Sequence, residues 1–287
     1  MDLSIIIVNY NTPKLTIDAI NSVIKTTKDL IYEIIVLDNG SSDNSISEIT
    51  DTFLDKIIFI DNKFNLGFSK ANNIGMSIAK GDYILLLNSD TVVKENTIDD
   101  SLSYIKQNKD IGALGCKILL KNGTLDKACK RGFPTPWNSL AYMLKLDKAF
   151  KNKKFGGYNL TYLNQDEINE VDCLMGAYMI VPREVIEKVG MLDETFFMYG
   201  EDIDWCYRIK SHGFKIVYYP KVEILHYKKA SSAKKRTKTI YEFNRAMIVF
   251  YNKHYKSKYN IFVSFAVYLG VAIKLILSLL INIVKRG

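Results

Sequence analysis

Three carboxylates, those of Asp38, Asp90 and Asp202, stand where an acid could bind a ligand or move a proton. The Asp38 carboxylate can accept a hydrogen bond from the imide N–H of a uracil or thymine base. The Asp90 carboxylate can ligate Mg²⁺ or Mn²⁺, which take oxygen ligands and keep water and phosphate oxygens among them. The Asp202 carboxylate can act as a general base toward an attacking hydroxyl group. Together these roles suit a reaction in which a diphosphate leaves with the help of a cation.

Polar residues accompany Asp38 and the end of the first apolar run, Leu3–Tyr10. Asn9 and Tyr10 end that run and Asn11 follows it, and the segment Asn-Gly-Ser-Ser follows Asp38. Asn9 and the backbone beside it can contact a base and a ribose. Asn, Asp, Gly and Ser are also common in turns for reasons of local hydrogen bonding alone. Two such segments at successive strand ends favour a nucleotide site.

Two further polar segments follow the third and fourth apolar runs, Lys56–Asp61 and Asp82–Asn88. Asn65 and Gly67 come after the third run, and Asn88 and Ser89 come directly before Asp90 at the end of the fourth. A Ser-Asp pair can simply cap the segment that follows it. An apolar run that ends in an acid also delivers that acid to the edge of a sheet, which favours the metal role for Asp90.

Aromatic side chains surround Asp202 in the stretch Phe196–Trp205 (FFMYGEDIDW). Glu201 and Trp205 are predicted to support the site or the acceptor beside Asp202. Acids are also favoured at helix N-termini by electrostatics alone, and this explanation suffices for Asp204.

The three histidines have different settings. His226 ends a strand-like run, where a neutral imidazole could complete a metal site. A structural role is the usual explanation for a single histidine in such a place. His212 and His254 are predicted to lie at the surface.

Strands that alternate with helices must position these residues. Four continuously apolar runs are typical of strands that are buried on both faces: Leu3–Tyr10, Tyr32–Asn39, Lys56–Asp61 and Asp82–Asn88. Helices are predicted to begin after Thr12-Pro13, at Asp43 or Asn44, and at Ser69. The alternation predicts an α/β fold with a doubly wound, mostly parallel sheet flanked by helices. Ligands of such sheets bind at the carboxyl ends of the strands.

The second half of the chain has a mixed pattern. A turn is predicted at Asn122-Gly123, a buried segment over Val171–Pro182, and two helices that end near Gly190 and Gly213. The four cysteines are far apart and form no Cys-x-x-Cys pair, which argues against a structural zinc site and suits a reducing cytosol.

Five segments in a fixed order resemble the family 2 glycosyltransferases of the GT-A fold, and among them the bacterial rhamnosyltransferase-like members. The segments are IIIVNYN, VLDNGSSD, NLGFSKANN, LLLNSD and FFMYGEDIDW, with His226 beyond them. Each segment alone is a weak signal, but the ordered set, which extends from Leu3 to about Ser232, is specific. The resemblance implies a GT-A type sheet and transfer of a sugar from a nucleotide-diphosphate donor to a hydroxyl group, with inversion at the anomeric carbon.

The resemblance also implies roles for single residues. It implies a divalent cation, Mg²⁺ or Mn²⁺, at Asp90 with help from His226, and Asp202 as the catalytic base. The family's metal motif is often Asp-x-Asp, whereas Asn88 holds its first position here, which leaves the strictness of metal dependence open. The donor-binding residues would be Asn9, Tyr10, Asn11, Asp38, Asn65, Gly67, Asn88 and Ser89.

The resemblance bears on the substrates too. It makes dTDP-rhamnose the first donor to consider and UDP-hexoses the next. A glycan or lipid-linked acceptor used in cell-surface polysaccharide synthesis suits a chain that attaches to a membrane.

Positive charge gathers in the C-terminal part of the chain. From Lys228 onward there are 13 Lys or Arg residues and one acid, a net charge of +12, so the first 227 residues carry −4 of the total of +8. A neutral-to-acidic body with a basic tail favours an anionic membrane surface over nucleic acid. No secretory signal precedes the first strand. We therefore expect the cytoplasmic face of the cell membrane, a catalytic domain over residues 1–232, and an attachment segment over residues 233–287.

The apolar stretch Ile261–Val284 has 24 residues and one charge, at Lys274, so it is long enough to span a bilayer. On a helical wheel its polar residues share one side: Ser264, Tyr268, Lys274, Ser278, Asn282 and, just beyond, Lys285. This stripe favours a helix that lies in the membrane interface or packs on a partner. A spanning helix and a buried terminal helix are the alternatives.

Two other functions fit parts of the pattern. A nucleotidyltransferase can share this type of sheet but would release pyrophosphate, whereas a glycosyltransferase releases a nucleoside diphosphate. A catalytically degenerate nucleotide-sugar-binding scaffold would tolerate Asn88. A dinucleotide-dependent reductase is disfavoured because no Gly-x-Gly-x-x-Gly follows the first strand.

Overall fold

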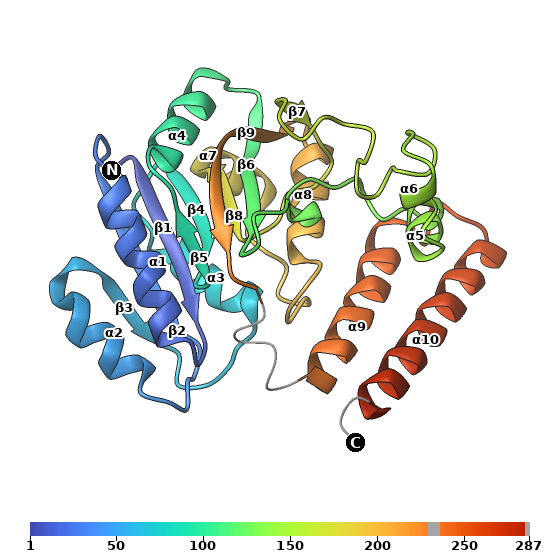
Figure 1. Ribbon diagram of the computed structural model, residues 1–287, viewed down its shortest axis with the longest axis horizontal. Helices are drawn as coiled ribbons and strands as arrows, with labels where there is room; N and C mark the ends of the chain where they lie inside the picture. The colour runs from blue at the N-terminus through green and yellow to red at the C-terminus, as the bar shows by residue number, and fades with distance from the viewer. Residues whose placement is uncertain (229–235, 285–287) are drawn as a thin grey trace.

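The protein is an α/β structure in which helices cover a central sheet, and a helical hairpin stands at one end (Figure 1). The computed structural model describes residues 1–228 and 236–284. The strands are β1 (Leu3–Asn9), β2 (Tyr32–Asp38), β3 (Ile58–Asp61), β4 (Tyr83–Asn88), β5 (Thr91–Val93), β6 (Ile111–Leu120), β7 (Asn169–Glu170), β8 (Tyr178–Pro182) and β9 (Lys215–His226). They are arranged in the order β3-β2-β1-β4-β8-β6-β9-β5, with β7 paired to β9.

The helices alternate with the strands in the first half of the chain and follow them in the second. The α-helices are α1 (Pro13–Thr26), α2 (Ser45–Phe53), α3 (Phe68–Ile78), α4 (Thr97–Gln107), α5 (Pro136–Met143), α6 (Leu146–Ala149), α7 (Arg183–Val189), α8 (Glu201–Ser211), α9 (Arg236–His254) and α10 (Ile261–Val284). Two short 3₁₀ helices are η1 (Leu54–Lys56) and η2 (Lys127–Cys129). The predicted α/β class is confirmed.

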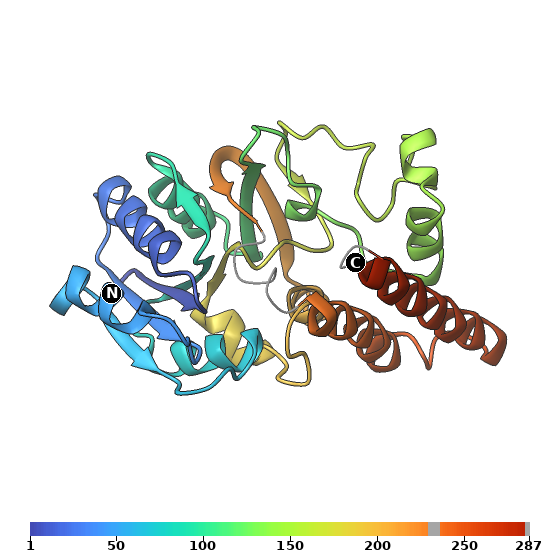
Figure 2. The same ribbon diagram turned by 60° about the horizontal axis from the view of Figure 1, so that its bottom comes forward.

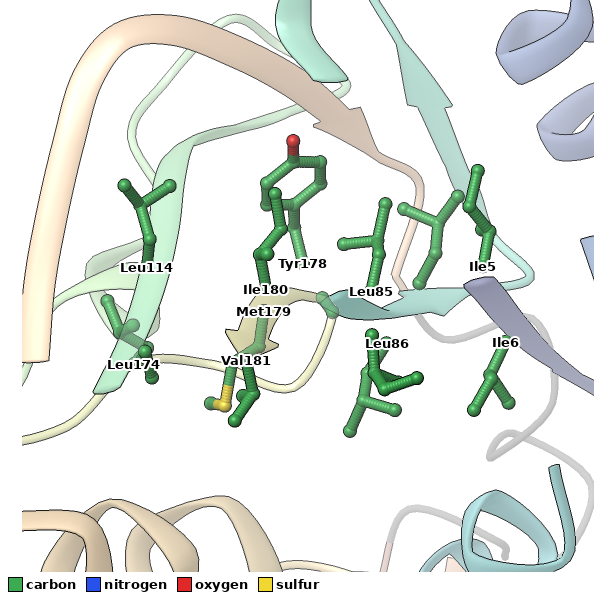
Figure 3. Close-up of a cluster of buried hydrophobic side chains, with 14 of the residues drawn as sticks. Ile5, Ile6, Leu85, Leu86, Leu114, Leu174, Tyr178, Met179, Ile180 and Val181 are labelled. Carbon is green, nitrogen blue, oxygen red and sulfur yellow. The ribbon is translucent and has the colours of Figure 1, made fainter. Parts of the chain in front are cut away.

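The four apolar runs of the first half form parallel strands, as predicted. β1 pairs with β2 and β4, and β2 pairs with β3, all in parallel register. Figure 3 shows why these runs have no polar alternation, because Ile5 and Leu85 point to one side of the sheet while Ile6 and Leu86 point to the other. All four side chains are buried. Complete burial of one such side chain contributes about 1.5–3 kcal/mol, so the burial of both faces fixes β1, β2 and β4. The prediction of burial on both faces is wrong for β3, which is the edge strand and has no buried residue.

The second half of the sheet is mixed. β8 runs antiparallel to β4 and β6, whereas β6 and β9 are parallel to each other. The predicted turn at Asn122-Gly123 is present after β6, and Gly123 has φ +78°. The last strand, β9, pairs antiparallel with β5, and this pairing sets His226 opposite Thr91. This pairing brings the end of β9 to the residues that follow β4.

Helix boundaries agree with the capping residues except at α3. α1 begins at Pro13 as expected, and Gly190 ends α7 with φ +86°. The prediction that Ser69 begins a helix is wrong by one residue, because α3 begins at Phe68 after Gly67. The Ser69 hydroxyl is used differently and donates to the carbonyl oxygen of Phe196 at 2.7 Å.

α9 and α10 form an antiparallel hairpin that packs through the polar side of α10. The Ser264 hydroxyl lies 2.8 Å from the hydroxyl of Tyr251, and the Tyr268 hydroxyl donates to Asn252 at 2.7 Å. The Lys274 ammonium lies 4.1 Å from the centroid of the Phe243 ring. Asn282 contacts α9 as well, through Thr237. The partner of the predicted polar stripe is therefore α9. The predicted boundary at residues 232/233 and Lys285 lie outside the described residues.

The apolar side of α10 faces outward. Phe262, Phe265 and Ile283 are 80%, 66% and 66% exposed. Within the described residues α10 is the one helix long and apolar enough to cross a membrane, which by itself is weak evidence of a membrane span. A large exposed apolar face is typical of a membrane or protein contact.

Candidate active site

The carboxyl ends of β1 and β2 are joined by a hydrogen-bonded unit of Asn9, Asp38 and Ser41. Asn9 is completely buried, and its side-chain amide donates to Asp38 Oδ2 at 2.7 Å. Asp38 is equally buried and accepts bonds from the backbone N–H and the hydroxyl of Ser41 at 2.8 and 2.7 Å. These side chains bond to one another, so they fix the shape of the strand ends. Each carboxylate oxygen can accept two hydrogen bonds, and the predicted contact of Asp38 with a base stays a prediction.

Asn11 extends this unit into the next loop. It adopts φ +54°, and its Oδ1 accepts a bond from the backbone N–H of Ser42 at 2.8 Å. Its own N–H donates to the hydroxyl of Ser41 at 2.8 Å. Tyr10 lies between Asn9 and Asn11 and is half-buried. The predicted donor residues after β1 and the Ser-Ser segment after β2 therefore form one surface.

Asn39 connects the end of β2 to the loop that follows β3. Its side-chain amide donates to the carbonyl oxygen of Gly67 at 3.1 Å and to Asn65 Oδ1 at 3.3 Å. Its Oδ1 accepts a bond from the N–H of Leu66 at 3.1 Å. Asn65 Oδ1 also accepts a bond from the N–H of Gly67 at 3.0 Å. The Asn-Leu-Gly segment is thus held by Asn39, which lies within the quoted VLDNGSSD segment.

Gly67 permits this loop to touch the chain that precedes α8. It has φ +87°, and a Cβ there would lie 2.5 Å from the carbonyl oxygen of Phe197. The backbone N–H of Phe68 donates to that same oxygen at 2.7 Å. A side chain at Gly67 would therefore push apart the loop after β3 and the start of the segment that carries Asp202.

Asp202 and the end of β4 lie on two sides of the same short segment. The backbone N–H of Asn88 donates to the carbonyl oxygen of Ala177 at 3.1 Å. A Cβ built on the preceding residue, Gly176, would lie 3.9 Å from Cβ of Asp202. Asp90 follows two residues after Asn88. The structure thus brings the end of β4 and the first turn of α8 together, although they are more than 100 residues apart in the chain.

A buried arginine binds Asp202. Nη2 of Arg131 donates to Asp202 Oδ2 at 2.6 Å and to the carbonyl oxygen of Leu174 at 2.7 Å. Burial alone would lower the pKa of Arg131, but the Asp202 carboxylate raises it, so the guanidinium is charged. Sequence reasoning missed Arg131, because it belongs to no motif and its partner lies 71 residues away.

Glu201 is buried beside this ion pair. Among the described residues its Oε2 has no hydrogen-bond partner. Burial, together with the adjacent Asp202, raises the pKa of Glu201 to about 8. The Glu201 carboxyl group is therefore neutral at pH 7, while the Asp202 carboxylate faces a charged arginine.

Replacing Glu201 by Gln should make stability less dependent on pH. The folded protein keeps a proton on Glu201 up to about pH 8, whereas the unfolded chain releases it near pH 4.3. Folding is therefore opposed increasingly as the pH rises through this interval. We expect the melting temperature of Glu201→Gln to exceed that of the parent protein by a margin that grows between pH 5 and pH 8. A margin independent of pH would contradict a neutral Glu201.

Asp90 is paired with His226 across β5 and β9. Asp90 Oδ1 and His226 Nε2 lie 3.1 Å apart. On the other side of the imidazole, Nδ1 lies 3.7 Å from Oδ2 of Asp126, and Lys228 Nζ lies 2.6 Å from that oxygen. Burial alone would lower the pKa of His226, but Asp126 and Asp90 raise it. The hydroxyl of Ser89 is buried and lies 3.5 Å from the hydroxyl of Thr12, in the loop after β1.

These residues fit a divalent cation. Asp90 offers an oxygen and His226 a nitrogen, and Asp126 lies on the side of the imidazole where a carboxylate often orients a metal-binding histidine, although 3.7 Å is too long for a hydrogen bond. His226 Nδ1 is buried without a hydrogen bond among the described residues. No group of three His, Cys, Asp or Glu side chains in the described chain could hold a metal ion alone. The remaining ligands would be water and diphosphate oxygens, as is usual for Mg²⁺.

Asp204 belongs to a different network that joins α8 to α9. It is completely buried, and it bonds to Arg208 Nε at 2.8 Å, Lys253 Nζ at 2.8 Å and His254 Nε2 at 2.7 Å. Burial alone would raise the pKa of Asp204, but these three groups lower it to about 2. The prediction of a surface His254 is wrong, because its side chain is 9% exposed and is held by Asp204. His212 is exposed, as predicted.

Trp205 is part of the core. Its side chain is completely buried, and its indole N–H donates to the carbonyl oxygen of Gly190 at 2.9 Å. Any support that Trp205 gives to the site therefore acts through the position of α8.

The chain is similar to glycosyltransferases in its sequence. Residues 4–190 match the model of the protein family described as Glycosyl transferase family 2. The chain is 30% identical to the low-salt glycan biosynthesis hexosyltransferase Agl10 of Haloferax volcanii over 78% of this chain and 67% of that protein. It is 25% identical to the N-acetylglucosaminyl-diphospho-decaprenol L-rhamnosyltransferase of Mycobacterium tuberculosis over 70% of this chain and 68% of that protein. Some relatives are longer, and the chain spans 17% and 35% of two of them.

A solved structure has the same fold. The crystal structure of GalNAc-T7 with UDP, GalNAc and Mn²⁺ superposes on 80% of this chain and 44% of that chain, with a TM-score of 0.61 and 18% sequence identity. At this identity the likeness concerns the fold, and it agrees with the predicted GT-A type sheet.

Proposed function

Because this chain belongs to glycosyl transferase family 2 and has the GT-A fold, we propose that it transfers a sugar from a nucleotide-diphosphate donor to a hydroxyl group of a glycan or lipid-linked acceptor, with inversion at the anomeric carbon. The observation that carries the proposal is the approach of Asp202 to the segment that pairs with the end of β4. Asp202, as the proton acceptor, and the end of β4, where the diphosphate is predicted to bind, would then lie on two sides of one active site.

Asp202 takes the proton of the acceptor hydroxyl, which attacks the anomeric carbon from the face opposite the diphosphate. Arg131 fixes the direction of the carboxylate through Oδ2, and the backbone N–H of Ile203 donates to Oδ1 at 2.8 Å. The oxygens keep lone pairs for an acceptor hydroxyl. A single displacement needs no protein nucleophile, so the configuration inverts.

The donor lies along the ends of β1, β2 and β4. The unit of Asn9, Asp38 and Ser41 sets the shape of the base and ribose site, and Asn39 holds the Asn65–Gly67 loop beside it. Asp90 and His226 would hold Mg²⁺ or Mn²⁺, which supplies positive charge for the leaving diphosphate when bound. The crystal structure of GalNAc-T7 with UDP and Mn²⁺ supports this choice of cation by its similar fold.

Removal of divalent cations should lower sugar transfer strongly. Loss of one group that stabilises developing negative charge costs about 10²–10³-fold in turnover. We expect such a loss in the presence of EDTA, recovery with excess Mg²⁺ or Mn²⁺, and a similar loss in Asp90→Asn. Release of nucleoside diphosphate measures the rate. Asp166→Asn, which changes an exposed carboxylate, is the control. A rate unaffected by chelator would contradict a cation at Asp90.

A panel of nucleotide sugars tests the function itself. The rhamnosyltransferase relative supports rhamnose as the transferred sugar, so dTDP-rhamnose is the first donor to test and UDP-hexoses are the next. We propose that the enzyme acts at the cytoplasmic face of the cell membrane, with α10 in contact with the bilayer. Release of pyrophosphate in place of a nucleoside diphosphate, or no turnover of any donor, would refute sugar transfer.

A further inference from the structure

The segment 136–155, which contains α5 and α6, exposes apolar side chains on its outer side. Trp137, Leu140 and Leu144 recur at helical spacing and are 45%, 48% and 60% exposed. Ala141, one turn after Trp137, is completely buried and packs α5 onto the protein. Phe150 after α6 is also half exposed. A surface helix of a soluble domain directs its apolar stripe toward the core, whereas α5 directs it outward.

The charged residues of this segment share one sign. Its lysines are Lys145, Lys148, Lys151, Lys153 and Lys154, and all five are exposed. The one acid in residues 136–155, Asp147, is buried and accepts a hydrogen bond from Asn159 at 2.7 Å. The exposed charge of the segment is therefore entirely positive. We call residues 136–155 the lysine–aromatic surface.

This surface lies at the same end of the molecule as α10. Figures 1 and 2 both show α5, α6 and α10 at the end that is farthest from α1 and α2. The outward side of α10 is apolar, and Phe262 and Phe265 are among its most exposed side chains. The lysine–aromatic surface thus adds basic and aromatic groups beside an apolar helix.

We propose that the lysine–aromatic surface docks on the headgroup region of a bilayer that contains anionic phospholipids, as a second contact beside α10. Exposed Trp and Leu side chains enter the boundary between headgroups and acyl chains, and lysine ammonium groups reach the phosphates. A protein partner would meet five lysines with no exposed acid among them, which favours an anionic lipid surface. The proposal rests on the membrane attachment proposed above for α10 and adds a contact to it.

Tryptophan fluorescence gives a readout specific to this surface. The chain has two tryptophans, and Trp205 is completely buried while Trp137 is 45% exposed. The full chain is reconstituted with vesicles of phosphatidylcholine alone or of phosphatidylcholine and phosphatidylglycerol in equal amounts, each with and without brominated lipid. We expect a blue shift and quenching of Trp137 emission in the anionic vesicles, weaker in the neutral ones, with Trp137→Phe giving the background from Trp205.

Charge variants test the role of the lysines. Lys145→Gln, Lys148→Gln and Lys151→Gln combined should lose most of the quenching in anionic vesicles. The matched control combines Lys25→Gln, Lys28→Gln and Lys56→Gln, which remove the same charge at the opposite end and should leave the quenching unchanged. Sugar transfer to a soluble acceptor, measured on the same variants, should not change.

Several results would overturn the proposal. Flotation of the chain with vesicles while Trp137 stays unquenched refutes this surface alone and leaves the α10 contact standing. Failure to float refutes both contacts, and the soluble assay still tests sugar transfer independently. Equal quenching in neutral and anionic vesicles refutes the role of charge. A blue shift that depends on protein concentration without lipid would assign the surface to a second copy of the chain.

Discussion

Asp202→Asn should lower the turnover number by about 10²–10⁴-fold, which is the usual contribution of a positioned general base. The amide keeps the shape of the side chain but cannot take the proton of an acceptor hydroxyl. Arg131 would lose its ionic partner, although its second bond, to the carbonyl oxygen of Leu174, does not depend on the substitution. Steady-state release of nucleoside diphosphate at saturating donor and acceptor measures the effect.

The control must separate chemistry from the electrostatics of a helix N-terminus. Glu184 lies in the first turn of α7 and is exposed. Glu184→Gln removes the same charge from an equivalent position, so it should leave turnover almost unchanged. Circular dichroism and the melting temperature show whether each variant is folded. Unchanged turnover in a folded Asp202→Asn variant would remove Asp202 from the role of base.

Asp204→Asn should destabilise the protein by about 3–5 kcal/mol, which is the usual cost of removing one partner from a buried ion pair, although Lys253 keeps a second acidic partner in Asp193. Here the positions left behind are Arg208, Lys253 and His254, which all contact the Asp204 carboxylate. Denaturant titration in mild detergent measures the free energy of unfolding.

An exposed ion pair provides the matched control for Asp204. Asp110 and Lys215 lie 2.6 Å apart with more than half of each side chain exposed, so Asp110→Asn should cost less than about 1 kcal/mol. The pH dependence gives a second check. Because the pKa of Asp204 is lowered to about 2, its stabilising contribution is complete above about pH 4 and is lost as the pH falls toward 2. An equal cost for both substitutions would contradict a buried network.

The first half of the fold could be predicted from local pattern alone. Strands buried on both faces leave continuous apolar runs, and each run was followed by the polar segment that the structure places at the edge of the sheet. The second half could not be predicted to the same degree. Its antiparallel pairing of β4 with β8 joins residues about 100 positions apart. Nothing in the sequence of either strand identifies the other as its partner.

Individual site residues show the same division. Asn9, Asp38 and Asn65 were found because their motifs are local, and the structure shows them within one set of loops, while their roles toward a donor stay predictions. Arg131 could not be predicted, because it belongs to no motif and the residues around it do not indicate that it binds a distant acid. His254 was misplaced for the same reason, because its burial depends on Asp204, which lies 50 residues away.

The polar stripe of α10 was visible in the sequence, but its partner was not. A helical wheel orders residues within one helix and says nothing about which helix lies opposite. The packing of Ser264 and Tyr268 on α9 depends on the turn between the two helices. Because the polar side of α10 contacts α9, its apolar side faces outward.

The Asp204 network ties the hairpin of α9 and α10 to the same helix that begins with Glu201 and Asp202. If α10 rests on a bilayer, the height of the reaction centre above the lipid is set by the protein and does not vary as the domain tumbles. An acceptor carried on a lipid would then have to present its hydroxyl at that height. The length of the carrier's headgroup, rather than a swing of the enzyme, would decide which chains can be extended.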